Sequence, residues 1–328
     1  MIVREATEAD IPEIVSLLKL SLGEALMQKS EAYWRWKHVE NPFGRSPVLV
    51  AALESGAIIG VRAFMRWDWE MDGKVVKAVR AVDTATHPSH QGKGIFTKLT
   101  RQLLETCKDN GVDIVFNTPN QKSMPGYIKM GWKKAGNVRF GITIRRPFSM
   151  FRNALLKPKS TAAIHEDNTV SDVLAQPELP DLLRRSQDVR RSVYSTPHTV
   201  DSLRWRYLTV PVASYSAASV GGDRLDAVFF YRIKHTRYGC EFRLLDLFRD
   251  ADVNLRSVYS EVSTLAKKIK ADFVTYPSFA TRDARIGLLS ANLKNGPIVT
   301  VREVNLAEMS SFDAFNHWEP SLGDLELF

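Results

Sequence analysis

The stretch from Val82 to Asn110 constrains the fold of this chain more than any other. Its first residues are β-prone and lead to Pro88, whereas the residues after Gly94 place apolar side chains at helical spacing. The pattern predicts a strand, a glycine turn and a helix. A glycine-rich turn that opens a helix directs several backbone N–H groups and the positive end of the helix dipole to one point. The sequence therefore predicts a phosphate-binding turn.

Two common nucleotide-binding turns do not fit. A Walker loop requires Gly-x4-Gly-Lys followed by Ser or Thr, and a dinucleotide turn requires a third glycine where this chain has Thr97. The stretch resembles instead the Gln/Arg-x-x-Gly-x-Gly/Ala signature of the GNAT acetyltransferases, whose turn holds the pyrophosphate of acetyl-coenzyme A. The matching residues are Gln91, Gly92, Lys93, Gly94, Ile95 and Phe96. Phe96 departs from the family's glycine or alanine, and Thr97 offers a hydroxyl to the phosphate. A plain glycine turn into a core helix is the alternative.

A second motif follows a predicted strand at residues 112–116. Asn120, Ser123, Tyr127 and Gly131 with Trp132 match a spacing that is common in GNAT proteins. The resemblance implies that Asn120 binds the cofactor and that Tyr127 is the general acid that protonates the departing thiolate. Two structural alternatives stay open: Asn120 orders the following helix, and Tyr127 packs in the core.

The resemblance also implies roles on the strand before the turn. A strand that splays from its neighbour exposes the amides of Thr84, Ala85 and Thr86 to pantetheine and to the thioester oxygen. Asp83 is the candidate catalytic base, although a structural role is the alternative. The predicted acceptor-binding residues are Trp34, His38 and His87, and no metal site is expected.

Composition limits the compartment and the partners. The chain has 328 residues, of which 44% are hydrophobic and 25% charged, enough for two domains with cores of their own. No signal peptide or membrane span is recognisable, and Cys107 and Cys240 are the two cysteines, so we expect a cytoplasmic protein without a disulfide framework. The net charge of +8 attracts anions, and coenzyme A is itself polyanionic. Without zinc-ligand or helix-turn-helix patterns, we expect no nucleic acid partner.

The second half of the chain resembles the first. Trp205 and Pro211 repeat the spacing of Trp36 and Pro42, and later segments match in the same order: Arg243–Asp246 with Arg80–Asp83, and Ala271–Val274 with Val112–Val115. The sequence thus predicts an α/β (mixed-sheet) fold of two tandem GNAT-like lobes, each a central mixed β-sheet flanked by helices. The expected segments are residues 1–144 for cofactor binding, a basic linker at 145–180, and a degenerate lobe at 181–328. The second lobe has carboxylates where the glycine turn would be, so it is not expected to bind coenzyme A.

The start of the predicted linker is unusual in charge. Residues 145–159 hold five basic side chains, no acidic one, and apolar residues between them. Such a segment could rest on an anionic membrane surface. A linker helix packed against one lobe is the favoured interpretation.

Together these features predict an acetyl-coenzyme A-dependent N-acetyltransferase. Its acceptor would be a primary amine on a small molecule, with an anionic amino sugar or sugar nucleotide as the candidate, and the amine would attack directly in a ternary complex. One alternative is a Fem-type aminoacyltransferase of cell-wall precursors, against which the glycine turn argues. Another is a non-catalytic acyl-coenzyme A-binding protein. The sequence names neither the acceptor nor the oligomeric state.

Overall fold

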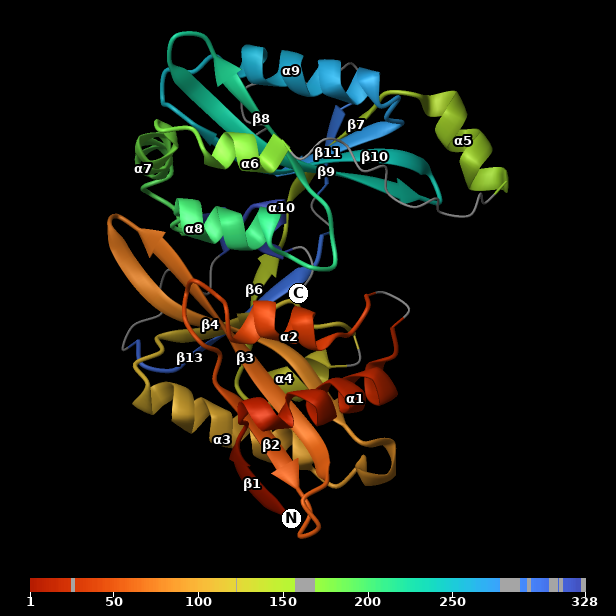
Figure 1. The fold of residues 1–328 in the computed structure, drawn as a ribbon, viewed down its shortest axis with the longest axis vertical. Helices are drawn as coiled ribbons and strands as arrows, with labels where there is room; N and C mark the ends of the chain where they lie inside the picture. Colours follow the sequence, from red (N-terminus) through yellow and green to blue (C-terminus); the bar gives the residue numbers. More distant parts are fainter. Residues whose placement is uncertain are drawn as a thin grey trace. The chain divides into compact units, whose positions relative to one another are not determined.

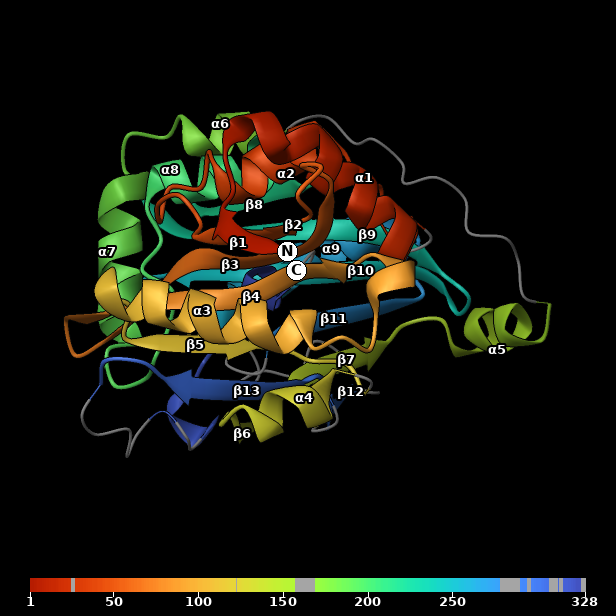
Figure 2. The same ribbon diagram turned by 90° about the horizontal axis from the view of Figure 1, so that it is seen from below.

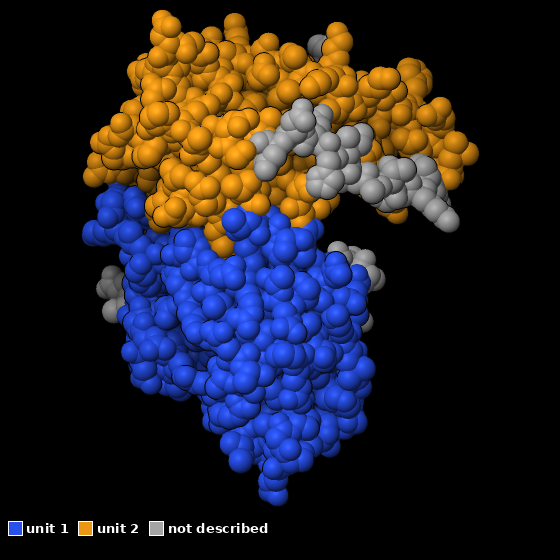
Figure 3. All heavy atoms as spheres, in the orientation of Figure 1, with its two compact units in different colours: residues 1–136, 209–212, 297–317 blue, residues 137–208, 213–296, 318–328 orange. Residues whose placement is uncertain are grey.

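The chain forms two compact units, each built on one β-sheet (Figures 1 and 3). The computed structural model describes residues 1–24, 27–121, 123–156, 169–277, 290–293, 296–306, 312 and 315–325. Unit 1 comprises residues 1–136, 209–212 and 297–317, and unit 2 comprises residues 137–208, 213–296 and 318–328. Both sheets are mixed and flanked by helices, so the predicted fold class is confirmed.

Unit 1 has a seven-stranded sheet in the order β1-β2-β3-β4-β5-β13-β6. Its strands are β1 (Ile2–Glu5), β2 (Val48–Ala52), β3 (Ile58–Met71), β4 (Lys74–Thr86), β5 (Ile114–Asn117), β6 (Lys133–Asn137) and β13 (Ile298–Glu303). Its helices are η1 (Glu8–Asp10), α1 (Ile11–Leu22), α2 (Glu31–His38), η2 (Pro88–His90), α3 (Ile95–Asp109), α4 (Met124–Lys129) and η5 (Phe315–His317). The predicted strand, glycine turn and helix are β4, the turn after η2, and α3.

Helices cover both faces of this sheet, as Figure 2 shows. Neighbouring residues of a strand point to opposite faces, so Val50 packs with α1 whereas Leu49 and Ala51 pack with α3. Gly60 of β3 lies under α3, where a Cβ would come within 2.7 Å of Ile95 and 3.2 Å of Leu99. The missing side chain therefore lets the first turn of α3 rest directly on the sheet.

The centre of the sheet opens where β4 and β5 separate. These strands are parallel, and their pairing ends with Arg80 opposite Phe116, although β4 continues to Thr86. A bulge interrupts β4 at Asp83, which has a positive φ of 37°. One edge of β4 beyond Arg80 consequently has no paired strand among the described residues on the β5 side.

Unit 2 has a six-stranded sheet in the order β12-β7-β11-β10-β9-β8. Its strands are β7 (Phe140–Ile144), β8 (Ser216–Gly221), β9 (Leu225–Thr236), β10 (Gly239–Arg249), β11 (Phe273–Pro277) and β12 (Ser290–Leu293). Its helices are α5 (Pro147–Leu156), α6 (Thr169–Leu174), α7 (Leu179–Val189), α8 (Val200–Leu203), the π-helical turn η3 (Arg204–Leu208), α9 (Leu255–Lys268) and α10 (Leu322–Leu325). Its main core lies between α9 and the strands β9, β10 and β11.

Each sheet takes one strand from the opposite half of the sequence. We expected residues 132–144 to complete the first lobe, but β7 pairs with β11 and β12 in the second sheet. In turn, β13 pairs with β5 in the first sheet. The predicted segments 1–144, 145–180 and 181–328 therefore do not coincide with the compact units. Within the predicted connecting chain at 160–180, residues 169–174 form α6, and residues 160–168 lie outside the described part.

Candidate active site

A cavity of about 320 Å³ opens in unit 1 where β4 ends and α3 begins. It is lined by Ser21, Leu22, Thr84, Ala85, Thr86, His90, Gln91, Gly92, Gly94, Ile95 and Phe96. The structure thus brings most of the predicted cofactor-binding residues to one place. Three of them, Lys93, Thr97 and Asn120, are not part of the lining. Ser21, Leu22 and His90 line it although the sequence did not indicate them.

The turn that lines the cavity leaves backbone donors available. Gly92 and Gly94 have φ values of 75° and 74°, which favour glycine, and a Cβ on either would meet nothing within 4 Å. Gly94 is the N-cap of α3 and has no side chain to bond the N–H groups of the first turn. The N-terminus of this 15-residue helix can therefore accept an anionic ligand in the cavity.

Side chains around the cavity hold the end of β4 in place. The hydroxyl of Ser21 donates to the carbonyl of Thr86 at 3.1 Å, and Nε2 of Gln91 donates to the same oxygen at 3.4 Å. Thr84 donates through Oγ1 to the carbonyl of Val61 at 3.4 Å. These bonds tie α1 and the glycine turn to the strand that would meet a thioester.

Asp83 lies at the centre of a buried polar cluster beside the cavity strand. Its Oδ2 accepts hydrogen bonds from Nζ of Lys37 at 2.8 Å and from Nε2 of His38 at 2.9 Å. The other ring nitrogen of His38 lies 3.0 Å from the hydroxyl of Ser46. Lys37 and His38 are adjacent on α2, so the bulge of β4 and the end of α2 are joined by this cluster.

Charge in the cluster is fixed by these contacts. Burial opposes ionisation of Asp83, but the Lys37 ammonium and the His38 hydrogen bond hold the pKa of its carboxyl well below the usual range. Burial likewise opposes the charge on Lys37, and Asp83 outweighs it and raises the pKa of the ammonium. Burial lowers the pKa of His38, so this imidazole is neutral near pH 7. Asp83 is accordingly a weak proton acceptor.

A narrow crevice next to the cluster contains the other predicted acceptor residue of α2. It is lined by Val15, Leu18, Lys29, Ser30, Tyr33, Trp34, Lys37 and Asp83. Trp34 packs against His38 with ring centres 4.2 Å apart. The crevice combines apolar and aromatic walls with two ammonium groups. The third predicted acceptor residue, His87, accepts a hydrogen bond from the N–H of Ser89 and caps η2.

Tyr127 lies in the core of unit 1, one side chain from the cavity. It is 3% exposed, and its hydroxyl accepts a hydrogen bond from Nη2 of Arg62 at 2.7 Å. Its ring meets the ring of Phe96, a cavity residue, at a centroid distance of 5.8 Å. Arg62 is fully buried and was not singled out from the sequence, although a lone arginine in the apolar run of β3 is a signal that could have indicated it.

Asn120 has a local structural contact. Its Oδ1 accepts from the N–H of Ser123 at 2.9 Å, just before α4 begins. This bond is the one expected if Asn120 orders the helix. Among the residues that the structure describes, no group of three or more His, Cys, Asp or Glu side chains could hold a metal ion.

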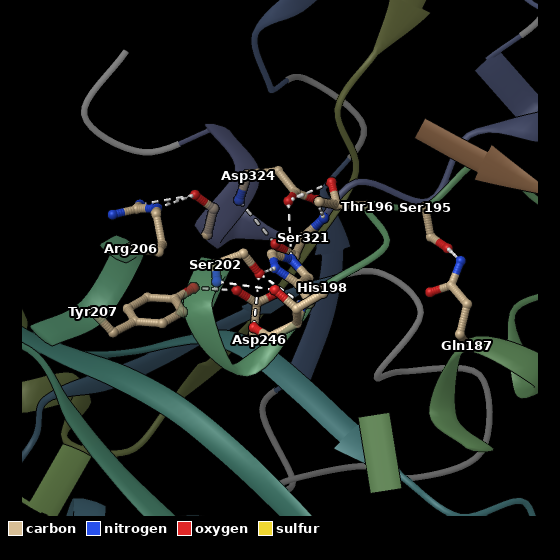
Figure 4. A network of polar contacts seen from close by, with 12 residues as sticks. Gln187, Ser195, Thr196, His198, Ser202, Arg206, Tyr207, Asp246, Ser321 and Asp324 are labelled. Carbon is tan, nitrogen blue, oxygen red and sulfur yellow. Dashed lines mark hydrogen bonds and ion pairs between the residues drawn. The ribbon is translucent and has the colours of Figure 1, made fainter. Parts of the chain in front are cut away.

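In unit 2, the residues that correspond to Lys37, His38 and Asp83 by the sequence match are Arg206, Tyr207 and Asp246. Their contacts differ from those in unit 1, as Figure 4 shows. The hydroxyl of Tyr207 donates to the carboxylate of Asp246, and Arg206 donates to the carbonyl of Gly323 at 3.0 and 2.8 Å. The following residue, Asp324, accepts from Thr196 at 2.8 Å. The C-terminal helix α10 is thereby fixed against β10.

The turn that follows β10 carries negative charge. Asp250 pairs with Arg185 at 2.8 Å and also with Arg224. Asn254 caps α9 with its side chain, which accepts from the N–H of Arg256 at 3.0 Å. This helix N-terminus therefore has a side-chain cap and a carboxylate nearby, the opposite of the turn before α3.

The splayed strands and the uncapped glycine turn of unit 1 form a site suited to an anionic ligand. Residues 2–135 match the family model described as an acetyltransferase (GNAT) domain. Over this segment the chain is similar to the GNAT acetyltransferases, a family whose members generally use acyl-coenzyme A. No curated protein matches the sequence.

Solved structures share the fold over nearly the whole chain. A conserved protein of unknown function from Enterococcus faecalis V583, described as a probable N-acyltransferase, is 13% identical with a TM-score of 0.67, over 93% of this chain and 73% of that one. A GCN5-related N-acetyltransferase from Anabaena variabilis is 14% identical with a TM-score of 0.65, over 93% and 73%. A GCN5-related N-acetyltransferase from Kribbella flavida is 13% identical with a TM-score of 0.56, over 92% and 70%.

Proposed function

We propose that unit 1 is an acetyl-coenzyme A-dependent N-acetyltransferase for a small amine. The observation that carries the proposal is the cavity between the free edge of β4 and the uncapped N-terminus of α3. In this assignment the N–H groups around Gly92 and Gly94 bind the pyrophosphate of the donor. Lys93, at the same turn, adds positive charge.

The end of β4 is the proposed site of the thioester. Backbone N–H groups of Thr84 and Thr86, on the edge of β4 away from β3, would donate to the pantetheine or to the thioester oxygen, where negative charge develops as the amine attacks the carbonyl carbon. Ala85 would line the site between them. A fixed donor at such an oxygen contributes on the order of 3 kcal/mol. The bulge at Asp83 and the bonds to the carbonyl of Thr86 keep this segment in place.

Tyr127 is the proposed general acid. As the C–S bond breaks, its hydroxyl would give a proton to the thiolate of coenzyme A. A thiol has a pKa of about 8.5 and a phenol one of about 10, so the transfer depends on the position of the hydroxyl. Arg62 would hold the hydroxyl through its 2.7 Å bond, and Phe96, which separates the ring from the cavity, would have to move aside for the transfer.

Asp83 receives a positioning role in this proposal. Its carboxylate already accepts from Lys37 and His38, and its lowered pKa makes it a poor base. The acceptor would bind outside the crevice beside this cluster, because the crevice between Lys29, Tyr33 and Trp34 has a volume of about 10 Å³, which is too small to enclose a sugar. These groups suit a small anionic amine such as an amino sugar or a sugar nucleotide.

A non-catalytic acyl-coenzyme A-binding protein is the second candidate. The observation that favours it is that Tyr127 does not line the cavity and is bonded to Arg62. The Fem-type alternative is not supported by a glycine turn built for a phosphate ligand.

Release of free thiol from acetyl-coenzyme A, measured over amino sugars, nucleotide-linked amino sugars, polyamines and peptides, tests the proposal. We expect turnover with at least one anionic amine, and a loss of about 100-fold in kcat in Tyr127→Phe with little change in donor affinity. Tyr231→Phe is the matched control, because this tyrosine is also 3% exposed but belongs to unit 2. Donor binding without turnover of any amine would instead favour the non-catalytic candidate.

A further inference from the structure

Helix α5 of unit 2 exposes large apolar side chains to solvent. Phe148 is 90% exposed, Phe151 and Leu155 are each 67% exposed, and Leu156 is 72% exposed. No residue of α5 is buried. Other exposed apolar side chains are dispersed over the described chain, as is usual for a protein surface, whereas these four share one ten-residue helix.

The helix is held to unit 2 along its other side. The backbone N–H groups of Arg145 and Arg146 donate to the carbonyl of Asp272 at 2.9 and 3.0 Å. Nδ2 of Asn153 reaches the carbonyl of Tyr238 at 3.5 Å. Figures 1 and 2 both show α5 at the edge of unit 2, near the β9–β10 turn where β10 starts. The helix is thus anchored at its start and middle while one face is uncovered.

The uncovered face is a continuous stripe. Phe148, Phe151 and Leu155 recur at spacings of three and four residues, so they lie on one side of the helix. Asn153, which contacts the β9–β10 turn, lies on the opposite side. We call Phe148, Phe151, Leu155 and Leu156 the α5 face.

Basic residues lie on α5 and on the turn beside it. Arg152 is an exposed residue of the same helix, and the sequence from 145 to 159 has five basic residues and no acidic one. The neighbouring β9–β10 turn adds Arg237, next to the exposed Tyr238. A fitting partner must therefore combine an apolar interior with a negatively charged surface.

We propose that the α5 face binds the surface of an anionic lipid bilayer. The four apolar side chains would enter the boundary between headgroups and acyl chains, while Arg152 and its basic neighbours contact lipid phosphates. Two copies of this face would bring like charges together, which disfavours self-association through it. Among the described residues, no helix is long and apolar enough to cross a membrane, so the contact would lie in the plane of the surface. This inference does not depend on the proposed acyl transfer.

Co-sedimentation of the full chain with vesicles tests the proposal. We expect binding to vesicles of phosphatidylglycerol and phosphatidylcholine, and much weaker binding to phosphatidylcholine alone. The variant Phe148→Gln/Phe151→Gln/Leu155→Gln should lower the partition coefficient by about 30-fold or more, because each apolar side chain contributes. Arg152→Gln should lower it by about fivefold on anionic vesicles only.

A matched control carries three glutamines at other exposed apolar positions. Ile2 and Leu20 are each 58% exposed and Val75 is 45% exposed, and all three lie in unit 1. Ile2→Gln/Leu20→Gln/Val75→Gln should bind vesicles as the unaltered protein does. Thermal unfolding verifies that each variant is folded.

Three results would overturn the inference. The unaltered protein could fail to sediment with anionic vesicles, or the α5 variant could bind them as well as the control does. The third result is a dimer, seen by analytical ultracentrifugation, that forms with rising concentration of the unaltered protein but not of the α5 variant. In that case neither protein would bind vesicles. That result would assign the α5 face to a second copy of this chain.

Discussion

The two units use the same frame and differ at one turn. In unit 1 the hairpin β3–β4 is followed by α3 and the parallel strand β5, and in unit 2 the hairpin β9–β10 is followed by α9 and the parallel strand β11. The register also agrees, since Arg80 pairs with Phe116 and Arg243 pairs with Thr275 at the last residue before each pair of strands separates. A pair of strands that separates at this point is therefore common to both units.

The turn decides what the frame can bind. Before α3 the N-cap is Gly94, which leaves the first-turn donors without a side-chain cap. Before α9 the cap is Asn254, and Asp250 with its two arginine partners precedes it. A capping asparagine in place of an uncapped glycine at the start of the helix, with a carboxylate nearby, thus makes the turn of unit 2 less suited to an anion.

The two units can also be compared at the buried aspartates Asp83 and Asp246. Asp83 accepts from two side chains of α2, and Asp246 accepts from Tyr207 of η3. A carboxylate that joins the central strand to a preceding helix is present with the glycine turn and without it. The contact therefore serves the frame, which is why we assign Asp83 to positioning.

The largest expected effect is on stability, in Asp83→Asn. Asparagine accepts the positive φ, but Lys37, 4% exposed, would lose its counter-charge, so the free energy of unfolding should fall by about 3 kcal/mol. Urea denaturation measures it. Asp68→Asn is the control, because it breaks the pair with Lys77, which is 57% exposed, and should cost less than about 1 kcal/mol. Equal losses would contradict the role given to Asp83.

A slightly smaller effect, on donor binding, is expected when a carboxylate is introduced into the turn before α3. Gly94→Asp should weaken binding of acetyl-coenzyme A by about 100-fold relative to Gly94→Asn, since the two side chains differ mainly in charge. No atom lies within 4 Å of the added Cβ, and both variants bear the same strain at φ 74°. Calorimetry of donor binding distinguishes them. Equal affinities would mean that the turn does not contact the phosphates.

Low pH should reduce the difference in the free energy of unfolding between the unaltered protein and Asp83→Asn. The pKa of Asp83 is lower in the folded chain than the value of about 3.9 expected in the unfolded chain, so its stabilisation is complete above that value and is lost as the pH falls below it. Urea denaturation at pH 7 and pH 3 should show the gap narrowing by about 1 kcal/mol. A gap that stays constant would show that Asp83 is not ionised in the folded protein.

The smallest effect is expected for Asp246→Asn in unit 2. The amide oxygen can still accept from Tyr207, and among the described residues no ion pair to Asp246 would be broken, so we expect a loss of about 1 kcal/mol. The same denaturation series measures it. A loss as large as that of Asp83→Asn would show that the two aspartates contribute equally to the free energy of unfolding.

Local patterns predicted the elements around the site well. Strand β1 and the helices α1 and α3 follow from alternation and helical spacing, and the turn follows from Gly92 and Gly94. These features depend on neighbouring residues. The match of Arg80 with Arg243 is consistent with the strand registers, although the tandem repeat itself remains a prediction.

Contacts between distant residues were not predictable in this way. The strands β7 and β13 have five and six residues, and nothing in so short a run says which sheet it joins. The partners of Asp83 depend on a bulge and on the end of α2, which alternation does not reveal. The contact between Arg62 and Tyr127 was not predicted for the same reason, because these two residues are far apart in the sequence.

The exchanged strands bear on how the protein is made. A ribosome delivers residues in order, so β5 and β6 wait for β13 until residue 303 has been synthesised, while β7 waits for β11. Until then both halves present unpaired strand edges, which are sites of aggregation. The sheet that contains most of segment 2–135 is consequently complete only after the second half of the chain has been translated.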